Sequence, residues 1–368
     1  MKKRVAILGA TGSIGKSALE VIARGQGDFE VILLTAHCRA DQLAELGRLY
    51  PGAATVHSGA EGGRESLLAA IAGCGADITL NGISGAAGLE PSMAAIEAGS
   101  NLALANKETL VMAGPLAIKR AHEKKVKIIP VDSEHSALFY LIEAHCAAHG
   151  ADALDEIILT ASGGPFRNHS LEEMKKVSPQ AALAHPTWNM GEKITIDSAS
   201  MANKGLEVIE AARLFNCSID KIRVVIHPQS VVHSMIRMKD GAVYAQLSRP
   251  DMRLPIHNAL YWPECAPSDF GRLSFDSLTL EFYPPDTEKF PLLSLAYEAA
   301  KKGGLYPCAY NAANEAAVAA FLAGRIGFLD IGRITRYVLD RDWNREPDDI
   351  ASVMEADRQA RTIAEEEI

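Results

Sequence analysis

Short apolar runs alternate with amphipathic stretches along the first third of the chain. Helical periodicity follows several of these runs, as at residues 16–23 and 109–124. The apolar runs have the length of buried strands and lie at residues 5–8, 29–35, 77–83, 101–105 and 126–131. Strands that alternate with helices predict a parallel sheet covered by helices on both faces. We therefore expect an α/β fold with an N-terminal Rossmann-like dinucleotide-binding domain over residues 1–131.

The pattern changes after residue 131. Apolar strand-like segments recur at residues 157–161, 193–197, 224–233 and 243–247, between helical stretches at 135–144 and 198–212. From residue 291 onward the periodicity is helical, over residues 292–302, 309–323, 329–340 and 348–367. We expect a central α+β catalytic and dimerisation domain (132–261), a Pro-containing linker (262–290) and a C-terminal helical bundle (291–368).

Composition narrows the possible partners and the compartment. The net charge of -9 over 368 residues, without a basic run, argues against a nucleic-acid-binding surface. No apolar run approaches the ~20 residues that a membrane span needs, and the first residues lack a signal-peptide core. The six cysteines are scattered, with no Cys-x-x-Cys pair. These features predict a cytoplasmic protein that binds neither nucleic acid nor membrane.

The first strand is followed by a glycine-rich turn at residues 9–15, with the spacing G-x-x-G-x-x-G. Glycines there let the backbone approach a pyrophosphate, which the following helix N-terminus would bind. The alternative is a tight turn without a ligand. The second strand ends without the acidic residue typical of NAD sites, and Arg39 stands nearby. This favours NADP over NAD, unless Arg39 is only a solvated loop cation.

Carboxylates follow the strand that ends at residue 131. Asp132 and Glu134, with Ser133 between them, offer oxygen ligands for a hard divalent cation. Two acids make an incomplete metal site. The alternative is a surface-exposed helix cap at Ser133, with acidic residues in the first turn of a helix over 135–144.

The stretch from Asp197 to Glu207 gathers polar groups near one helix start. Ser198 is the expected cap, and Asn203 and Glu207 fall one turn apart on the same face. A helix N-terminus with a hydroxyl, an amide and Lys204 suits a phosphate, and Glu207 suits a metal ion or a proton. An ordinary capped helix with a solvated polar face is the alternative.

Two loops and two histidines complete the candidate chemistry. The Ser162–Gly164 turn has a shape that can enclose an anion, and the loop 185–191, with Trp188, is suited to close over a ligand. Trp188 is alternatively an anchor of that loop to the core. We interpret His227 and His233 as hydrogen-bonding core residues rather than as metal ligands.

Long strings of residues, in order along essentially the whole chain, resemble the 1-deoxy-D-xylulose 5-phosphate reductoisomerase family. These strings are GATGSIG (9–15), LANKETL (104–110), PVDSEHSA (130–137), SGGPF (162–166), HPTWNMG (185–191), DSASMANKGLE (197–207), HPQSVVHS (227–234) and NAANE (311–315). The resemblance implies rearrangement and reduction of this sugar phosphate to 2-C-methyl-D-erythritol 4-phosphate, in isoprenoid precursor synthesis. It further implies NADPH, Mg²⁺ or Mn²⁺, and a two-fold homodimer built on the strands of the middle region.

The resemblance also assigns roles to residues of this chain. It implies the metal ligands Asp132, Glu134 and Glu207, and thereby supplies the third acid. The implied substrate contacts are Lys107, Ser133, Glu134, Ser162, His185, Trp188, Ser198, Asn203, Lys204 and Glu207. The implied cofactor contacts are Thr11, Gly12, Ser13, Ile14, Asn106, Glu108, Gly191 and Met252. We assign catalytic roles to Lys107, Glu134, His185 and Glu207, with Glu134, His185 or a water as the proton-transfer group.

One segment departs from the family pattern, and two other functions compete. Relatives often carry Ala-Gly-x-Asn where this chain has Ala-His-Cys-Arg (36–39), so the family's adenosine contacts do not carry over directly to this segment. Ala36 and Arg39 are the cofactor contacts that we expect there. A semialdehyde-dehydrogenase-like enzyme would need a reactive cysteine, for which Cys217 lacks an activating base. A catalytically silent sensor of NADP and sugar phosphate would not need all three acids.

Overall fold

The computed structural model describes residues 2–25, 27–184, 188 and 190–368. Two compact units share the chain. The first unit comprises residues 1–109, 115–136 and 251–272, and the second comprises residues 110–114, 137–250 and 273–368. The predicted division at residues 131, 261 and 290 stays a prediction.

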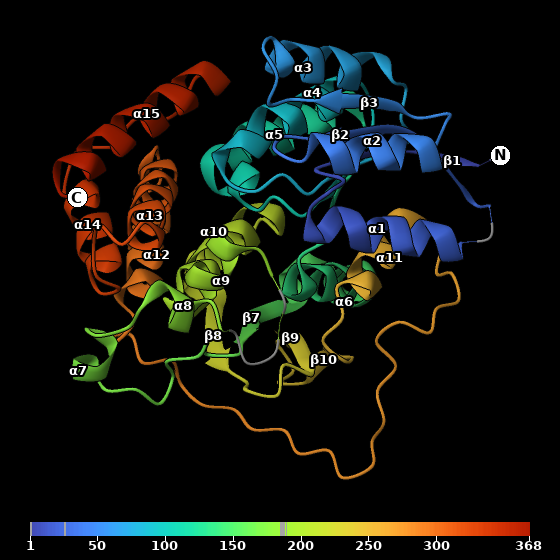
Figure 1. Ribbon diagram of the computed structural model, residues 1–368. Helices are drawn as coiled ribbons and strands as arrows, with labels where there is room; N and C mark the ends of the chain where they lie inside the picture. The colour runs from blue at the N-terminus through green and yellow to red at the C-terminus, as the bar shows by residue number, and fades with distance from the viewer. Residues whose placement is uncertain (1, 26, 185–187, 189) are drawn as a thin grey trace. The chain divides into compact units, whose positions relative to one another are not determined.

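A six-stranded sheet forms the centre of the first unit, in the order β3-β2-β1-β4-β5-β6 (Figure 1). Every neighbouring pair of strands runs parallel. The strands are β1 (Lys3–Leu8), β2 (Phe29–Ala36), β3 (Ala54–His57), β4 (Ile78–Asn81), β5 (Asn101–Leu104) and β6 (Ile128–Pro130). This is the strand order of dinucleotide-binding sheets, in which ligands bind beyond the carboxyl ends of the strands. The predicted Rossmann-like domain is confirmed.

A late segment of the chain completes the core of the first unit. Helix α11 (Arg253–Tyr261) packs against α1 (Ser13–Arg24), and Ile256, Leu260 and Phe270 join the apolar cluster around β1 and β2. The other helices of this unit are α2 (Ala40–Leu49), α3 (Gly63–Gly73) and α4 (Leu89–Glu97). Helices α5 (Glu108–Lys124) and α6 (Ser133–His149) contribute to both units.

The second unit contains a mixed four-stranded sheet in the order β10-β9-β7-β8. Its strands are β7 (Leu154–Ala161), β8 (Ile222–Ile226), β9 (Val232–Met238) and β10 (Val243–Leu247). Strands β7 and β8 are parallel, whereas β9 runs antiparallel to both of its neighbours. β7 and β8 end level with each other, because Ala161 pairs with Ile226. The residues that follow these two strands, Ser162 and His227, therefore lie at the same end of the sheet.

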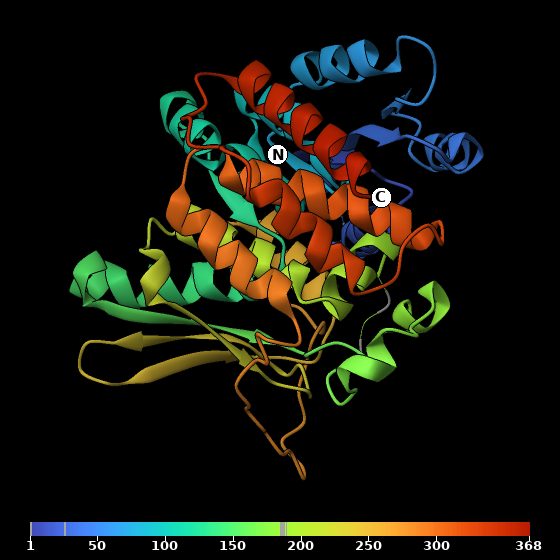
Figure 2. The same cartoon turned by 90° about the vertical axis from the view of Figure 1, so that its left-hand side faces the viewer.

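The remaining helices belong to the second unit. They are α7 (Leu171–Met174), α8 (Pro179–Ala182), α9 (Glu192–Ala199), α10 (Ala202–Leu214), α12 (Pro291–Lys302), α13 (Tyr306–Leu322), α14 (Asp330–Leu339) and α15 (Ile350–Glu366). Figure 2 shows α12 to α15, in orange and red, packed side by side, with α13 against α14 and α15. The predicted C-terminal helical bundle is confirmed. Within the described residues, no helix combines the length and the apolar character that a bilayer crossing requires.

Two local predictions near residue 198 are wrong. The segment 193–197 lies within α9 rather than in a strand, because its apolar positions also suit a buried helix. The Thr195 hydroxyl donates to the Gly191 carbonyl one turn earlier, which accommodates a β-branched residue in the helix. Ser198 is likewise not a cap: it lies inside α9, and Met201, with a φ of 64°, separates α9 from α10.

Candidate functional site

In the turn between β1 and α1, the backbone at Gly15 lies close to the backbone of Gly9 and Ala10. Gly9 has a φ of 78°, a conformation that favours glycine. A Cβ on Gly15 would lie 2.5 Å from the Gly9 carbonyl oxygen, so only glycine fits there. Within the described residues, no side chain caps α1. The N–H groups of its first turn therefore suit a phosphate.

Arg39 lies against this turn. Its Nη1 donates to the Thr11 carbonyl at 2.8 Å, which brings a guanidinium beside residues 9–15. An arginine near this turn is one residue type that can accommodate a 2′-phosphate, and the contact itself stays a prediction.

Asn106 holds the start of α5 and the turn after β4. Its Nδ2 donates to the carbonyls of Ile83 and Gly85, both at 2.8 Å, and its Oδ1 accepts from the Thr109 hydroxyl at 2.6 Å. A Cβ on Gly88 would lie 2.4 Å from the Asn106 side chain. Asn106 therefore holds together the backbone that follows β4 and β5. Its hydrogen bonds also fix the positions of the neighbouring residues Lys107 and Glu108.

Asp132 caps helix α6, the role that sequence reasoning gave to Ser133. Asp132 Oδ1 accepts from the backbone N–H groups of Glu134 at 3.1 Å and His135 at 3.3 Å. Its Oδ2 pairs with the Lys107 ammonium at 2.5 Å, and both side chains are largely buried. The surface-exposed alternative is therefore wrong, because a buried carboxylate paired in this way is not a solvated cap.

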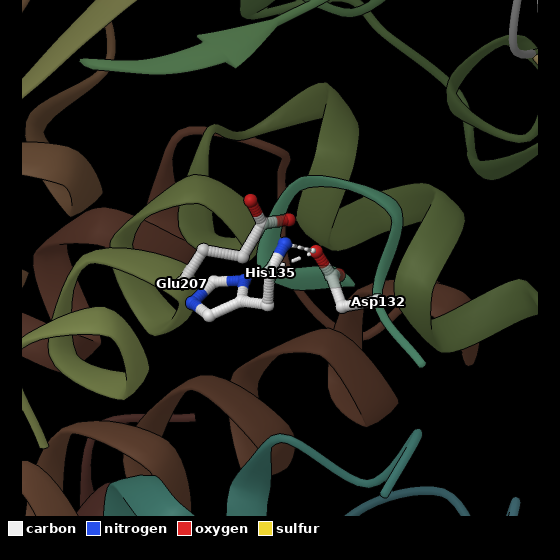
Figure 3. Close-up of side chains that lie close together, drawn as sticks. All are labelled: Asp132, His135 and Glu207. Atoms are coloured by element: carbon white, nitrogen blue, oxygen red, sulfur yellow. Dashed lines mark hydrogen bonds and ion pairs between the residues drawn. The ribbon is translucent and has the colours of Figure 1, made fainter. Parts of the chain in front are cut away.

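His135 is a residue that sequence reasoning missed. Its Nδ1 donates to Asp132 Oδ1 at 3.1 Å (Figure 3). The His135 side chain is fully buried. The signal was present in the spacing, since residues i and i+3 of a helix share a face. Glu134, by contrast, accepts from the Ser133 hydroxyl at 2.6 Å.

Helix α10 of the second unit carries an amide, an ammonium and a carboxylate within one turn. Asn203 Nδ2 donates to Glu207 Oε1 at 2.7 Å, and Lys204 Nζ pairs with Glu207 Oε2. Lys204 and Glu207 are buried. The prediction that Asn203 and Glu207 share a face is confirmed. The alternative of a solvated polar face is wrong, because Lys204 and Glu207 pair with each other away from water.

The Ser162–Gly164 turn contacts the end of α9. Gly163 and Gly164 have φ values of 85° and 68°, and a Cβ on Gly164 would lie 2.8 Å from the Ser198 carbonyl oxygen. The Gly164 N–H donates to the Ser162 hydroxyl at 3.3 Å. Ser162 and Ser198 are therefore on neighbouring segments of one unit, which agrees with a shared ligand.

Other candidates divide between the two units. His185 lies outside the described residues. Trp188 packs edge-on to His233, with ring centroids 6.3 Å apart, as an anchoring residue would. Gly191 is the exposed residue before α9, and Met252 packs against the core of the first unit at the start of α11.

His227 and His233 make hydrogen bonds, as expected. His227 Nδ1 donates to the Glu281 carbonyl at 2.9 Å, and its Nε2 accepts from the Val231 N–H at 3.2 Å. Burial lowers the pKa of His227 despite the opposing effect of the Glu281 carbonyl and charge. The neutral ring therefore fixes the 281–283 segment to the end of β8.

The cysteines do not favour the competing dehydrogenase chemistry. All six are free thiols. Burial raises the pKa of Cys217 in spite of the nearby Lys221, whereas a nucleophilic cysteine needs a lowered pKa.

Comparison with known proteins covers nearly the whole chain. Family models match it as "1-deoxy-D-xylulose 5-phosphate reductoisomerase" over residues 5–62 and 52–114, and as the C-terminal domains of that enzyme over residues 128–215 and 247–363. The chain is 46% identical over 371 residues to the Treponema denticola reductoisomerase, covering 99% of this chain and 96% of the relative. It is 47% identical over 390 residues to the Heliobacterium modesticaldum enzyme, covering 100% and 98%.

Solved structures of the same family superpose closely. The Zymomonas mobilis reductoisomerase in complex with NADPH matches with a TM-score of 0.91 at 42% identity, over 99% of this chain and 98% of that one. A DOX-P reductoisomerase in complex with NADPH, fosmidomycin and magnesium matches with a TM-score of 0.91 at 37% identity, over 99% and 98%. This chain therefore belongs to the 1-deoxy-D-xylulose 5-phosphate reductoisomerase family.

Proposed function

We propose that this protein rearranges 1-deoxy-D-xylulose 5-phosphate and reduces it to 2-C-methyl-D-erythritol 4-phosphate, with NADPH as hydride donor and Mg²⁺ or Mn²⁺ as metal. The reaction serves isoprenoid precursor synthesis. The observation that carries the proposal is the first turn of α10, where Asn203 and the buried Lys204 both bond to the buried carboxylate of Glu207. Burying an ammonium and a carboxylate costs free energy even when the two are paired, which favours a turn that serves ligand binding.

The metal fits the donors that the chain provides. Asp132, Glu134 and Glu207 offer carboxylate oxygens, which hard divalent cations prefer over nitrogen or sulfur. Figure 3 draws two of them, Asp132 and Glu207, together with His135. When bound, the cation supplies Lewis acidity toward the carbonyl and hydroxyl oxygens of the substrate. His135 orients the Asp132 carboxylate through its Nδ1–H, as a supporting hydrogen bond does around many metal sites.

Lys107 holds charge next to this carboxylate. Its ammonium is buried and paired with Asp132, so it balances negative charge in the site and donates to an oxygen of the substrate as charge develops. Glu134, hydrogen-bonded to Ser133, is placed to accept or return a proton. His185 is the second candidate for that proton transfer.

Four residues of the second unit bind the phosphate. Ser162, Ser198, Asn203 and Lys204 offer hydroxyl, amide and ammonium donors, and the contact of Gly164 with Ser198 keeps two of their segments adjacent. The phosphate does not react, so its binding free energy positions the carbon atoms that do. Trp188 and the loop around it exclude water from the reacting carbons when the loop closes.

NADPH binds beyond the carboxyl ends of the strands of the six-stranded sheet. The backbone of Thr11, Gly12, Ser13 and Ile14 meets the pyrophosphate at the start of α1, and Arg39 meets the 2′-phosphate. Ala36, Asn106, Glu108, Gly191 and Met252 complete the contacts. The side chain of Asn106 is engaged in structural hydrogen bonds, so its cofactor contact is made by backbone.

A direct assay of NADPH oxidation tests the function. Purified protein is mixed with NADPH, 1-deoxy-D-xylulose 5-phosphate and MgCl₂, and NADPH oxidation is followed by absorbance while the product is identified by mass spectrometry. We expect oxidation that stops when a chelator is added and returns with excess Mg²⁺ or Mn²⁺. Metal-independent oxidation, or no oxidation with the metal present, would contradict the proposal.

The protein also forms a two-fold homodimer in the cytoplasm. Edge strand β10 exposes Val243 and Tyr244, so apolar surface remains at a free sheet edge. The segment 273–290, which pairs with β8 at Tyr283, exposes Phe275 and Phe282 as well. Sedimentation equilibrium is expected to give twice the 39.5 kDa mass of the chain. Free cysteines throughout agree with a reducing compartment.

A further inference from the structure

A hydrogen bond between α9 and the C-terminal bundle crosses 117 positions of the sequence. Asn314 Nδ2 on α13 donates to Asp197 Oδ1 on α9 at 2.7 Å, and both side chains are almost completely buried. The other oxygen of Asp197 pairs with Lys193 Nζ at 2.9 Å. Both oxygens of the carboxylate are therefore held from two directions.

Among the described residues, Asp197 is the hydrogen-bond partner that the structure gives for the Asn314 side chain. Its carbonyl oxygen is buried without a hydrogen-bond partner among them. A buried amide that leaves one group unsatisfied carries a free-energy cost, which points to a use for its other group. That other group is the N–H that meets Asp197, and the carboxylate fixes which way the amide faces.

The partners of this pair extend into α13 and α15. Glu315, next to Asn314, accepts from Asn311 Nδ2 at 3.0 Å and from Arg361 Nη2 at 2.7 Å. Arg361 is held in turn by Asp357. The turn of α13 that carries Asn314 is therefore fixed to α15 through Glu315 and Arg361. This restricts movement of Asn314 together with α9.

Asp197 directly precedes Ser198, the hydroxyl that the proposed function assigns to the substrate phosphate. Rotation of α9 about its axis would move Ser198 and would also move Met201, the left-handed residue from which α10 begins. The geometry points to Asp197 and Asn314 as a positioning pair that fixes the phosphate-binding donors of α9 and α10 from the C-terminal bundle. This inference rests on the proposed function.

An exchange of the two side chains tests it. Asn314→Asp places two buried carboxylates in contact, whereas Asp197→Asn combined with Asn314→Asp restores the hydrogen bond with donor and acceptor reversed. We expect Asn314→Asp to raise the KM for 1-deoxy-D-xylulose 5-phosphate by roughly 10-fold or more, the size of a lost hydrogen bond to a charged group. The exchanged variant is expected to return to within about 3-fold of the parent.

Readouts outside the phosphate site separate positioning from loss of fold. The Kd for NADPH, measured by fluorescence titration, is expected to be unchanged in the exchanged variant. A single cooperative thermal unfolding transition shows that this variant is folded, and its midpoint is expected to be lower than that of the parent because Asp197→Asn removes the ion pair with Lys193. Asn344→Ala, at an exposed position of the C-terminal region, is the matched control and is expected to leave the KM unchanged. If Asn314→Asp does not fold, Asn314→Ala replaces it with the same expected rise in KM.

Two results would overturn the pair. One is an unchanged KM in the folded single variant; the other is a folded exchanged variant whose KM stays high. The variant Ser198→Ala distinguishes failure of the positioning pair from failure of the proposed function. An unchanged KM in Ser198→Ala contradicts the phosphate contact itself, whereas a raised KM there with an unchanged KM in Asn314→Ala overturns the positioning pair alone.

Discussion

Lys204 and Glu207 form a buried ion pair within a single turn of α10, and Asn203 binds the second oxygen of the same carboxylate. A carboxylate that is held at both oxygens is pre-oriented, which favours rapid and specific capture of a cation. An ammonium beside it remains available to a phosphate when the cation takes the carboxylate. The first two predictions follow from this turn.

Replacement of Glu207 by Gln keeps the size of the side chain and removes its charge. We expect kcat to fall about 100-fold or more, because a charged ligand of the electrophile is lost. The Kd for NADPH, measured by fluorescence titration, is expected to change less than about 2-fold, since the proposed contacts with its pyrophosphate and 2′-phosphate lie in the first unit and Glu207 lies in the second. Glu298→Gln, which removes a partly exposed acid of α12 in the same unit, is the control. Equal kcat in both variants would remove Glu207 from the metal site.

Replacement of Lys204 by Ala removes the charged donor that we propose for the substrate phosphate. We expect the KM for the sugar phosphate to rise roughly 10- to 100-fold, the range of a charge-assisted hydrogen bond. Competition by inorganic phosphate is expected to weaken in parallel. Lys221→Ala provides a lysine control within the same unit. An unaltered KM with unaltered phosphate competition would contradict the assignment.

Gly205 allows α10 to lie directly against the C-terminal bundle. A Cβ at this position would lie 2.7 Å from Ala296 Cβ and 2.7 Å from the Tyr310 hydroxyl. We therefore expect Gly205→Ala to lower the free energy of unfolding by about 1–3 kcal/mol, as overpacking does. Gly73→Ala, near the end of α3 with no atom close to the added Cβ, is expected to be neutral or slightly stabilising. Denaturant titration measures both, and equal midpoints would refute the close approach.

We propose that Arg39 discriminates between the two nicotinamide cofactors. We expect Arg39→Ala to reduce the NADPH-to-NADH ratio of kcat/KM about 10-fold or more, because only NADPH carries the 2′-phosphate. Arg48→Ala, an exposed arginine of α2, is expected to leave that ratio unchanged. A ratio in Arg39→Ala equal to that of the parent would assign the discrimination to other residues.

His227 makes folding stability depend on pH. Burial lowers its pKa in the folded protein below the ordinary 6.5, so the unfolded chain binds more protons near that pH. The stabilising effect of the neutral ring is present above about pH 6.5 and is lost as the pH falls through the folded pKa. His227→Gln is expected to flatten this slope, whereas His122→Gln, exposed on α5, is not. Denaturant titrations across the range would show parallel slopes if the assignment were wrong.

Much of the first unit follows from the sequence, because its strands are continuous apolar runs and its turn carries diagnostic glycines. The shared face of Asn203 and Glu207 was also predictable from helical spacing alone. Segment 193–197 was not, since alternating apolar residues fit a strand as well as a short buried helix. The cap assignments failed for a related reason: Asp132 and Ser133 are both good caps, and only tertiary contacts with Lys107 decide between them.

The pair of Asp197 and Asn314 lay beyond prediction from local patterns. Their residues are 117 positions apart, and neither spacing nor periodicity relates α9 to α13. Buried polar contacts of this kind depend on how helices pack. They become visible only when the fold is known.

The central claim is that Asp132, Glu134 and Glu207 bind one cation. Crystals soaked with MnCl₂ and measured at the manganese absorption edge test it most directly. We predict a single anomalous peak within coordination distance, about 2.0–2.3 Å, of carboxylate oxygens from all three residues. A peak elsewhere, or one that lacks Glu207 among its ligands, would contradict the account.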